Sequence, residues 1–180
     1  MTTPKPPATA EFAFRQKKMV VKTALVALGA GFELLSKMSP EMVDEIRDWP
    51  EGRTLMLGVL PDGPSITVRK RNGRLVLLGS GDLGAEIKIL FKNVDSAFLV
   101  MSAQIGSHTA FAEHRAIVHG SLREVMEVNR ALALVLKYLF PSVLLKRVTK
   151  RMPGFTRKQL VVKAKLYALI GPALATGLFK

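Results

Sequence analysis

Residues 53–78 read RTLMLGVLPDGPSITVRKRNGRLVLL, and apolar and polar residues alternate along much of this segment. Alternation with a period of two is typical of a β-strand with one buried face. Residues 61–64 (PDGP) supply turn chemistry between the first two segments. Asn72-Gly73 is the strongest short hairpin signal, because both residues tolerate the positive φ angles of a type I′ turn. We therefore predict three antiparallel strands at 53–60, 65–71 and 74–78.

Two further strands and several helices surround this stretch. Residues 86–91 alternate again, and residues 115–119 form a short strand that ends at Gly120. Helical periodicity predicts helices at 12–38, 40–49, 94–105, 107–114, 121–140, 142–151 and 157–170. This order predicts an α+β fold, with a mostly antiparallel sheet covered on one face by helices.

Several helix ends carry recognisable signals. Ser121 with Glu124 three residues later is a capping box, and Asn93 is suited to cap the helix that follows it. Gly106 suits the C′ position at the end of that same helix. Gly29 and Gly31 weaken the first helix and predict a kink or an end there.

A family pattern appears in residues 85–136. Its elements are the strand Ile87–Phe91, the helix Val94–Ile105 before Gly106, the pair Ala110-Phe111, the strand Ile117-Val118 before Gly120, and Leu122 and Met126 in an amphipathic helix. The stretch resembles the sterol-binding domain of the sterol carrier protein type-two family. It is also similar to the small lipid-binding accessory proteins of quinone biosynthesis. The resemblance covers about residues 40–140 and departs in the N-terminal helix and after Pro141.

The resemblance implies a five-stranded sheet whose helices enclose an apolar tunnel. It implies binding of fatty acyl, sterol or isoprenoid lipids without chemistry. Flexible methionine side chains and aromatic rings suit such a pocket, because they repack around different hydrocarbon chains. Our candidate walls are the apolar residues Phe98, Met101, Ile105, Phe111, Val125, Met126 and Leu132. The alternative is that these side chains only fill the core, and the sequence does not separate the two.

The amino-acid composition limits the classes of partner that the protein is expected to bind. Of 180 residues, 48% are hydrophobic and 23% are charged, which excludes a disordered or low-complexity protein. The absence of cysteine excludes disulfide scaffolds, thiolate metal sites and thiol nucleophiles. The formal net charge is +13, and the mean hydropathy of +0.22 is high for so basic a chain. We therefore expect an anionic partner, and a lipid surface rather than nucleic acid.

The basic excess is concentrated at the C-terminal end, where no acidic residue follows Glu127. Basic and apolar residues alternate there as in elements that lie in a membrane interface. The candidate docking residues are Lys146, Arg147, Lys150, Arg151, Arg157, Lys158, Lys163 and Lys165. The alternative is a solvated basic face packed on the domain. We divide the chain into a disordered lead at 1–10, a lipid-binding domain at 11–140 and basic amphipathic helices at 141–180.

No catalytic or metal site is predicted. His108, His114 and His119 lie six and five residues apart, whereas a helical zinc pair needs residues i and i+4. We expect no metal, no cofactor and no enzymatic activity. We also expect no signal peptide and no membrane-spanning helix, because no cleavage pattern follows the apolar run 23–32 and no window of about 18 uncharged apolar residues exists.

These observations predict a non-enzymatic lipid-binding or lipid-transfer protein, cytoplasmic and peripherally associated with membranes. A peripheral membrane scaffold with a filled core is the main alternative. A nucleic-acid-binding module is the weaker one, because aromatic residues for base stacking are few. The oligomeric state is open.

Overall fold

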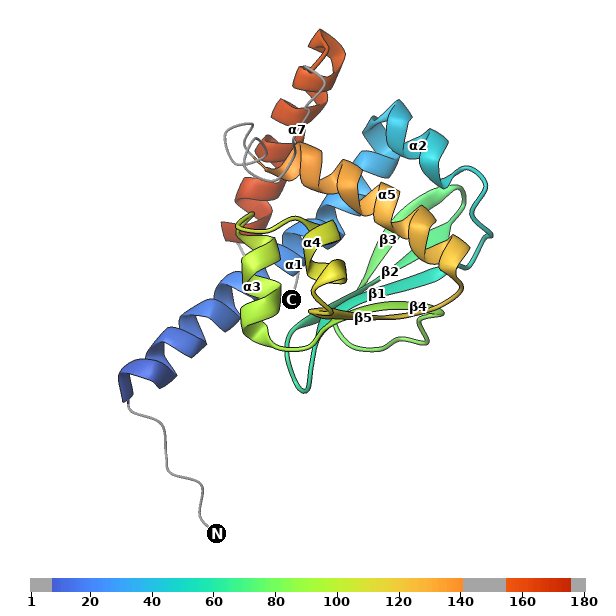
Figure 1. Cartoon of the computed structure of the whole chain (residues 1–180). Helices are drawn as coiled ribbons and strands as arrows, with labels where there is room; N and C mark the ends of the chain where they lie inside the picture. The colour runs from blue at the N-terminus through green and yellow to red at the C-terminus, as the bar shows by residue number, and fades with distance from the viewer. Residues whose placement is uncertain (1–7, 141–154, 176–180) are drawn as a thin grey trace.

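The computed structural model describes residues 8–140 and 155–175 (Figure 1). Its elements, in chain order, are α1 (Ala8–Met38), α2 (Pro40–Ile46), β1 (Thr54–Val59), β2 (Ser65–Arg71), β3 (Arg74–Gly79), β4 (Ile87–Phe91), α3 (Val94–Met101), α4 (Ser107–Ala112), β5 (Ala116–His119), α5 (Leu122–Leu139) and α7 (Arg157–Ala175). The predicted helix at 142–151 lies outside the described residues.

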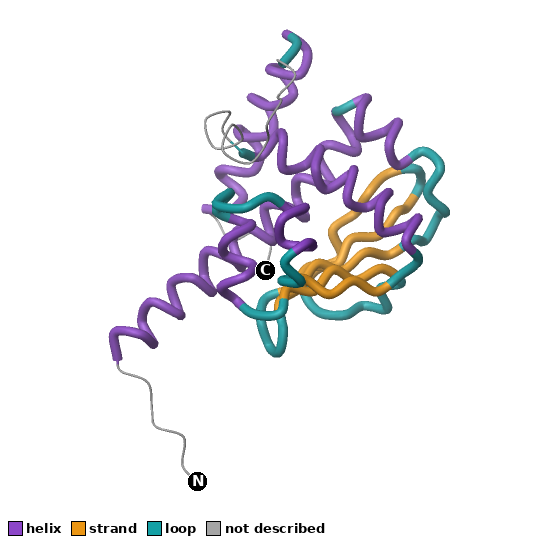
Figure 2. Tube along the Cα trace, viewed as in Figure 1, coloured by secondary structure: helices purple, strands orange, loops and turns teal. Residues whose placement is uncertain are grey.

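The five strands form one sheet in the order β3-β2-β1-β4-β5. Strands β1 and β4 pair in parallel, and the other three pairs are antiparallel. The helices gather on one side of this sheet (Figure 2). The α+β fold with a mostly antiparallel five-stranded sheet covered on one face is therefore confirmed.

The turn and register of the first strands follow the sequence pattern. Asn72 and Gly73 have φ angles of 53° and 70°, and Arg71 pairs with Arg74 across the turn they make. Leu57 of β1 lies beside Ile66 of β2 and Ile89 of β4. All three side chains are almost completely buried, so the apolar residues of neighbouring strands form continuous rows beneath the helices.

Helix α1 runs without interruption for 31 residues, so the predicted break at Gly29 and Gly31 is wrong. A Cβ atom at Gly29 would lie 2.7 Å from Leu77 Cδ1, and one at Gly31 would lie 2.7 Å from Val135 Cγ1. The two glycines therefore let α1 lie close against β3 and α5. The helix also begins at Ala8, so residues 8–10 are helical rather than part of a disordered lead, and residues 1–7 lie outside the described part.

Helix α7 packs on α1 and α5. Its residues Leu166 and Ile170 are buried and belong to the same apolar core as the sheet. One face of α7 thus covers the domain, while residues on its opposite face, such as Leu160 and Val161, are exposed.

Helix α1 is the one described helix that is long and apolar enough to span a bilayer. Half of its most apolar window is buried inside the domain, and core helices of soluble proteins often satisfy the same criterion. Length and composition are therefore weak evidence for a span.

Candidate functional site

A small apolar space lies between the sheet and α3, α4 and α5. Its volume is about 10 Å³, the room that about one water molecule needs. Eleven of its twelve lining residues are apolar: Leu28, Leu57, Ile89, Phe91, Val100, Met101, Ala110, Phe111, Ala116, Leu132 and Leu136, with Ser107 as the polar member. The space as it stands is too small for a hydrocarbon chain, so an open tunnel stays a prediction.

The short helix α4 covers this space. Ala103 before it and His114 after it have φ angles of 54° and 52°, a left-handed conformation that costs about 1 kcal/mol for residues other than glycine. Helix α3 ends at Met101 rather than at residue 105. Gly106 consequently occupies the N-cap of α4, not the C′ position of the helix before it, and it offers no side chain to cap α4.

The seven candidate wall residues divide into three groups. Met101, Phe111 and Leu132 line the apolar space. Phe98, Ile105 and Val125 are half-buried and pack against the core. Met126 is 49% exposed, so the prediction that it faces inward is wrong. The buried residues of α5 include Val128, Leu132 and Val135, so the predicted inward position of Leu132 is confirmed while Met126 lies outside the buried set.

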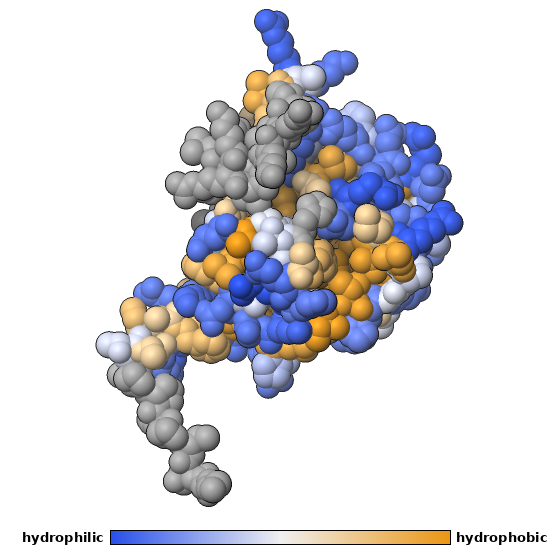
Figure 3. Space-filling model, viewed as in Figure 1, coloured by the Kyte–Doolittle hydropathy of each residue, from blue (hydrophilic) through white to orange (hydrophobic). Residues whose placement is uncertain are grey.

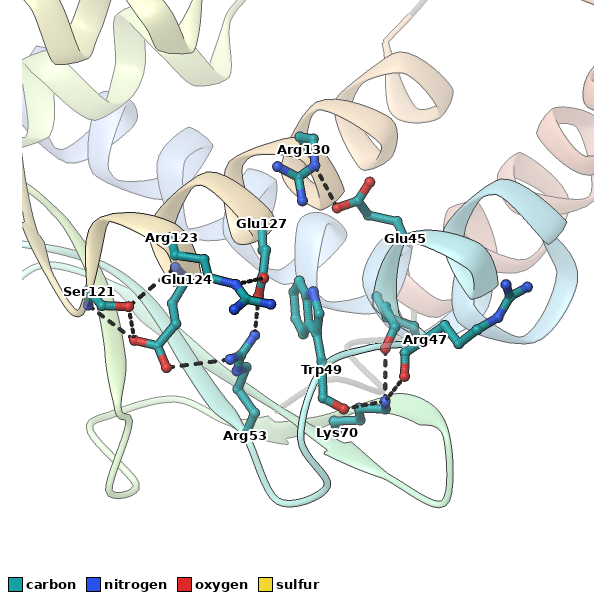
Figure 4. A network of polar contacts seen from close by, with 11 residues as sticks. Glu45, Arg47, Trp49, Arg53, Lys70, Ser121, Arg123, Glu124, Glu127 and Arg130 are labelled. Atoms are coloured by element: carbon teal, nitrogen blue, oxygen red, sulfur yellow. Dashed lines mark hydrogen bonds and ion pairs between the residues drawn. The ribbon is translucent and has the colours of Figure 1, made fainter.

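A partly buried polar cluster closes the other end of the sheet–helix interface (Figure 4). The Arg53 side chain, 7% exposed, donates hydrogen bonds to Glu127 at 2.5 Å and to Glu124 at 3.4 Å. Its guanidinium also lies 5.5 Å from the centre of the Trp49 ring. We call Arg53, Glu124 and Glu127 the clasp, because they join the residue before β1 to helix α5.

Lys70 of β2 makes a second buried connection, to the end of α2. Its Nζ donates to the carbonyl oxygens of Ile46 at 2.8 Å, Arg47 at 3.0 Å and Trp49 at 2.6 Å. A lysine charge suits this position, because the carbonyl groups at a helix C-terminus have few other donors. The sequence did not predict the buried contacts of Arg53 and Lys70. The alternation of apolar and polar residues assigns both to strands but does not show which groups their side chains contact.

The pKa values of both glutamates of the clasp are lowered from the ordinary value. Burial alone would raise the pKa of Glu127, but hydrogen bonds from Arg53 and Arg123 and their positive charges outweigh it. Hydrogen bonds from the hydroxyl and the backbone of Ser121 lower the pKa of Glu124, and the nearby arginines add to this. Both carboxyl groups are therefore ionised at neutral pH. The predicted capping box of Ser121 and Glu124 is present.

The described docking candidates do not all face solvent. Arg157, Lys158 and Lys165 are exposed on α7. Lys163 is only 9% exposed. Its Nζ donates to the Phe140 carbonyl at 2.7 Å and lies 4.5 Å from the Phe155 ring centre, and burial lowers its pKa. The prediction that Lys163 faces a membrane is therefore wrong. The remaining candidates, Lys146, Arg147, Lys150 and Arg151, lie outside the described residues.

Two of the three candidate histidines, His114 and His119, are exposed on different parts of the fold. His114 is exposed in the turn after α4, and His119 is exposed at the end of β5. Within residues 8–140 and 155–175, no group of three or more histidine, aspartate or glutamate side chains is placed to hold a metal ion.

Comparison with known proteins shows that the chain is similar in structure to solved proteins. No family model and no curated protein matches the chain. The chain is similar to the UbiJ-SCP2 ubiquinone synthesis protein, with 17% identity and a TM-score of 0.42 over 59% of this chain and 94% of that one. It is also similar to a conserved hypothetical protein of Thermus thermophilus, described as a candidate sterol carrier protein. The identity is 16% and the TM-score 0.44, over 71% of this chain and 90% of that one. Both solved structures carry the name of the family that residues 85–136 resemble.

Proposed function

We propose that this chain binds a lipid in the apolar space beneath α4 and acts as a non-enzymatic lipid carrier. The observation that carries the proposal is the lining itself, which is apolar at eleven of twelve positions and is drawn from α1, α3, α4, α5 and three strands. Fatty acyl, sterol and isoprenoid lipids are the ligand class that such a lining suits, because each buried methylene contributes about 0.8 kcal/mol.

Binding requires α4 to move outward, because the space of about 10 Å³ must grow to admit a hydrocarbon. Left-handed residues flank α4 on both sides, so the segment is held between two strained turns. Figure 3 shows apolar residues gathered on the surface between α4 and α5, above β5. We place the entrance there.

Two matched methionine variants test this site. Met101→Gln puts an amide into the lining, whereas Met126→Gln makes the same change on the exposed side of α5. Native mass spectrometry of the full chain with added fatty acids should show bound lipid for wild type and Met126→Gln. For Met101→Gln the bound fraction should fall about tenfold, since a buried polar group without a partner costs about 1–3 kcal/mol.

Thermal unfolding of both variants separates binding from folding. Equal lipid binding by wild type and Met101→Gln, with Met101→Gln folded, would contradict the proposal. Wild type that binds no fatty acid, sterol or isoprenoid would do so as well.

A carrier must reach donor and acceptor membranes, so we also propose a peripheral association of this protein with the cytoplasmic face of a membrane. Exposed Arg157, Lys158 and Lys165 on α7 support an attraction of about 1 kcal/mol each to anionic lipid. The second candidate function is a peripheral scaffold with a filled core, which the small volume of the apolar space favours. A scaffold would sediment with anionic vesicles and yet bind no free lipid.

A further inference from the structure

The first turns of α1 extend beyond the domain (Figure 1). Phe12 is 64% exposed, Met19 is 71% exposed and Val20 is 46% exposed. Figure 3 shows apolar and polar residues side by side on this protruding end. Large apolar side chains gathered on an otherwise solvated helix end mark a surface that another partner covers.

Two apolar faces run along α1, and they point in different directions. The inner face contains Val21, Leu25 and Leu28, which are buried in the core. Phe12, Met19 and Val20 share the other face, because residues seven and eight apart lie on one side of a helix. We call these three residues the outer stripe. At about 100° per residue the outer stripe lies opposite the inner face, so the domain cannot cover both.

A basic row flanks the outer stripe. Arg15, Lys18 and Lys22 are three and four residues apart and therefore lie together on the helix surface. Arg15 is paired with Glu11 at 2.9 Å, and the Lys18 amino group lies 3.4 Å from the Asp62 carbonyl oxygen. Lys18 and Lys22 also line an open groove of about 460 Å³ beside the turn between β1 and β2.

We infer that the outer stripe and the basic row form a membrane-docking surface, with α1 lying in the plane of an anionic bilayer. An apolar stripe next to a basic row is the arrangement of helices that lie in the membrane interface. Charge complementarity favours an anionic lipid surface over a second copy of this chain, because the net charge of +13 makes two copies repel each other. This surface is separate from the proposed lipid cavity and from the exposed face of α7.

Paired double variants of the full chain test the surface. Phe12→Ser/Met19→Ser removes most of the outer stripe. Leu122→Ser/Met126→Ser is the matched control, because these residues are 80% and 49% exposed and belong to α5, outside both α1 and α7. Sedimentation with phosphatidylcholine vesicles, with and without phosphatidylglycerol, measures binding. We expect wild type and control to bind the anionic vesicles, and the α1 variant to bind at least about tenfold more weakly.

Unchanged binding by the α1 variant would overturn the inference, and so would a loss confined to the α5 control. A dimeric wild type that becomes monomeric only in the α1 variant, with no vesicle binding by either, would show that a second copy covers the stripe instead. Circular dichroism should show that both variants are folded, since the altered side chains are exposed. Fatty acid binding by the α1 variant in mass spectrometry should match wild type, which separates this surface from the proposed cavity.

A single cysteine gives the depth of insertion, because the natural chain has none. An environment-sensitive fluorophore on Met19→Cys should shift to shorter emission wavelengths with anionic vesicles, whereas the same label on Leu122→Cys, 80% exposed on α5, should not. Equal shifts at both positions would contradict docking through α1. Resistance of wild type to alkaline extraction from the vesicles would show that α1 crosses the bilayer, and would contradict the in-plane arrangement.

Discussion

The two ends of the sheet–helix interface are held by different forces. At one end the clasp and Lys70 join strands to helices through charged hydrogen bonds between buried groups. At the other end α4 covers an apolar space and is flanked by left-handed residues. Hydrogen bonds that involve charged groups depend strongly on distance and angle, so they hold the joined elements in one arrangement. Apolar contacts depend less on direction, so the packed helix can shift slightly at low cost. We therefore expect the clasp end to stay fixed and the α4 end to open if the protein binds lipid as proposed.

Breaking the clasp should have the largest effect on stability. Arg53→Ala leaves Glu127 partly buried without its main partner, and we expect the free energy of unfolding to fall by about 3 kcal/mol. Arg123→Ala is the control, because Arg123 contacts the same carboxylate from an 84% exposed position and should cost less than about 0.5 kcal/mol. Urea denaturation measures both. Equal losses would show that burial of Arg53 does not set the strength of the clasp.

Substitution of Lys70 should have the second-largest effect on stability. Lys70→Met keeps an unbranched apolar stem of similar length but lacks the amino group, and so removes three hydrogen bonds to carbonyl groups. We expect a loss of about 2 kcal/mol in the free energy of unfolding. Arg71→Met, at the exposed neighbouring position, should change stability by less than about 0.5 kcal/mol. If Lys70→Met lowered the free energy of unfolding no more than Arg71→Met does, Lys70 would not stabilise the clasp end of the interface.

Acid should weaken the clasp. The folded-state pKa of Glu127 lies below the ordinary glutamate value of 4.5. The stabilisation from ionised Glu127 is therefore complete above that value and is lost as the pH falls through the folded-state pKa. We expect wild type to be more stable than Glu127→Gln at neutral pH, and the difference to shrink on acidification below about 4.5. A difference that stays constant into strong acid would contradict the ionised clasp.

The smallest effect concerns the α4 end. His114→Gly places the residue best suited to φ 52° in the turn after α4, and we expect a gain of about 0.5 kcal/mol. Ala112→Gly, at an exposed helical position of α4, should instead cost about 0.5–1 kcal/mol. Hydrogen exchange of the α4 amides should slow in the first variant and quicken in the second. The same direction in both variants would show that the turn is not strained.

The sequence predicts the hairpin turn and the capping box correctly, because residues a few positions apart determine these local structures. The hairpin at Asn72-Gly73 and the capping box at Ser121 depend on residues a few positions apart, and both are present. The parallel pairing of β1 with β4 joins segments far apart in the chain and leaves no local trace. The burial of Arg53 and Lys70 is equally hidden, because long basic side chains in strands usually face solvent.

The candidate site is harder to predict than the fold. The predicted stripe of α5 includes Leu122 and Met126, which are apolar yet exposed, and this widens the apparent apolar face beyond the buried one. Lys163 is wrongly predicted because a basic residue next to apolar ones is typical of an interface lysine, whereas here its amino group is held by the carbonyl oxygen of Phe140. Neither outcome has a signal in the local pattern.

The long contact surface of α1 has a consequence for synthesis on the ribosome. This helix packs on β2, β3, α3, α5 and α7, all of which are translated after it. The last of these partners, α7, ends at Ala175. The apolar inner side of α1 is therefore not fully covered until α7 has left the ribosome. During synthesis the apolar inner side of α1 is therefore exposed before its partners exist, and transiently exposed apolar surface of this kind is prone to aggregation.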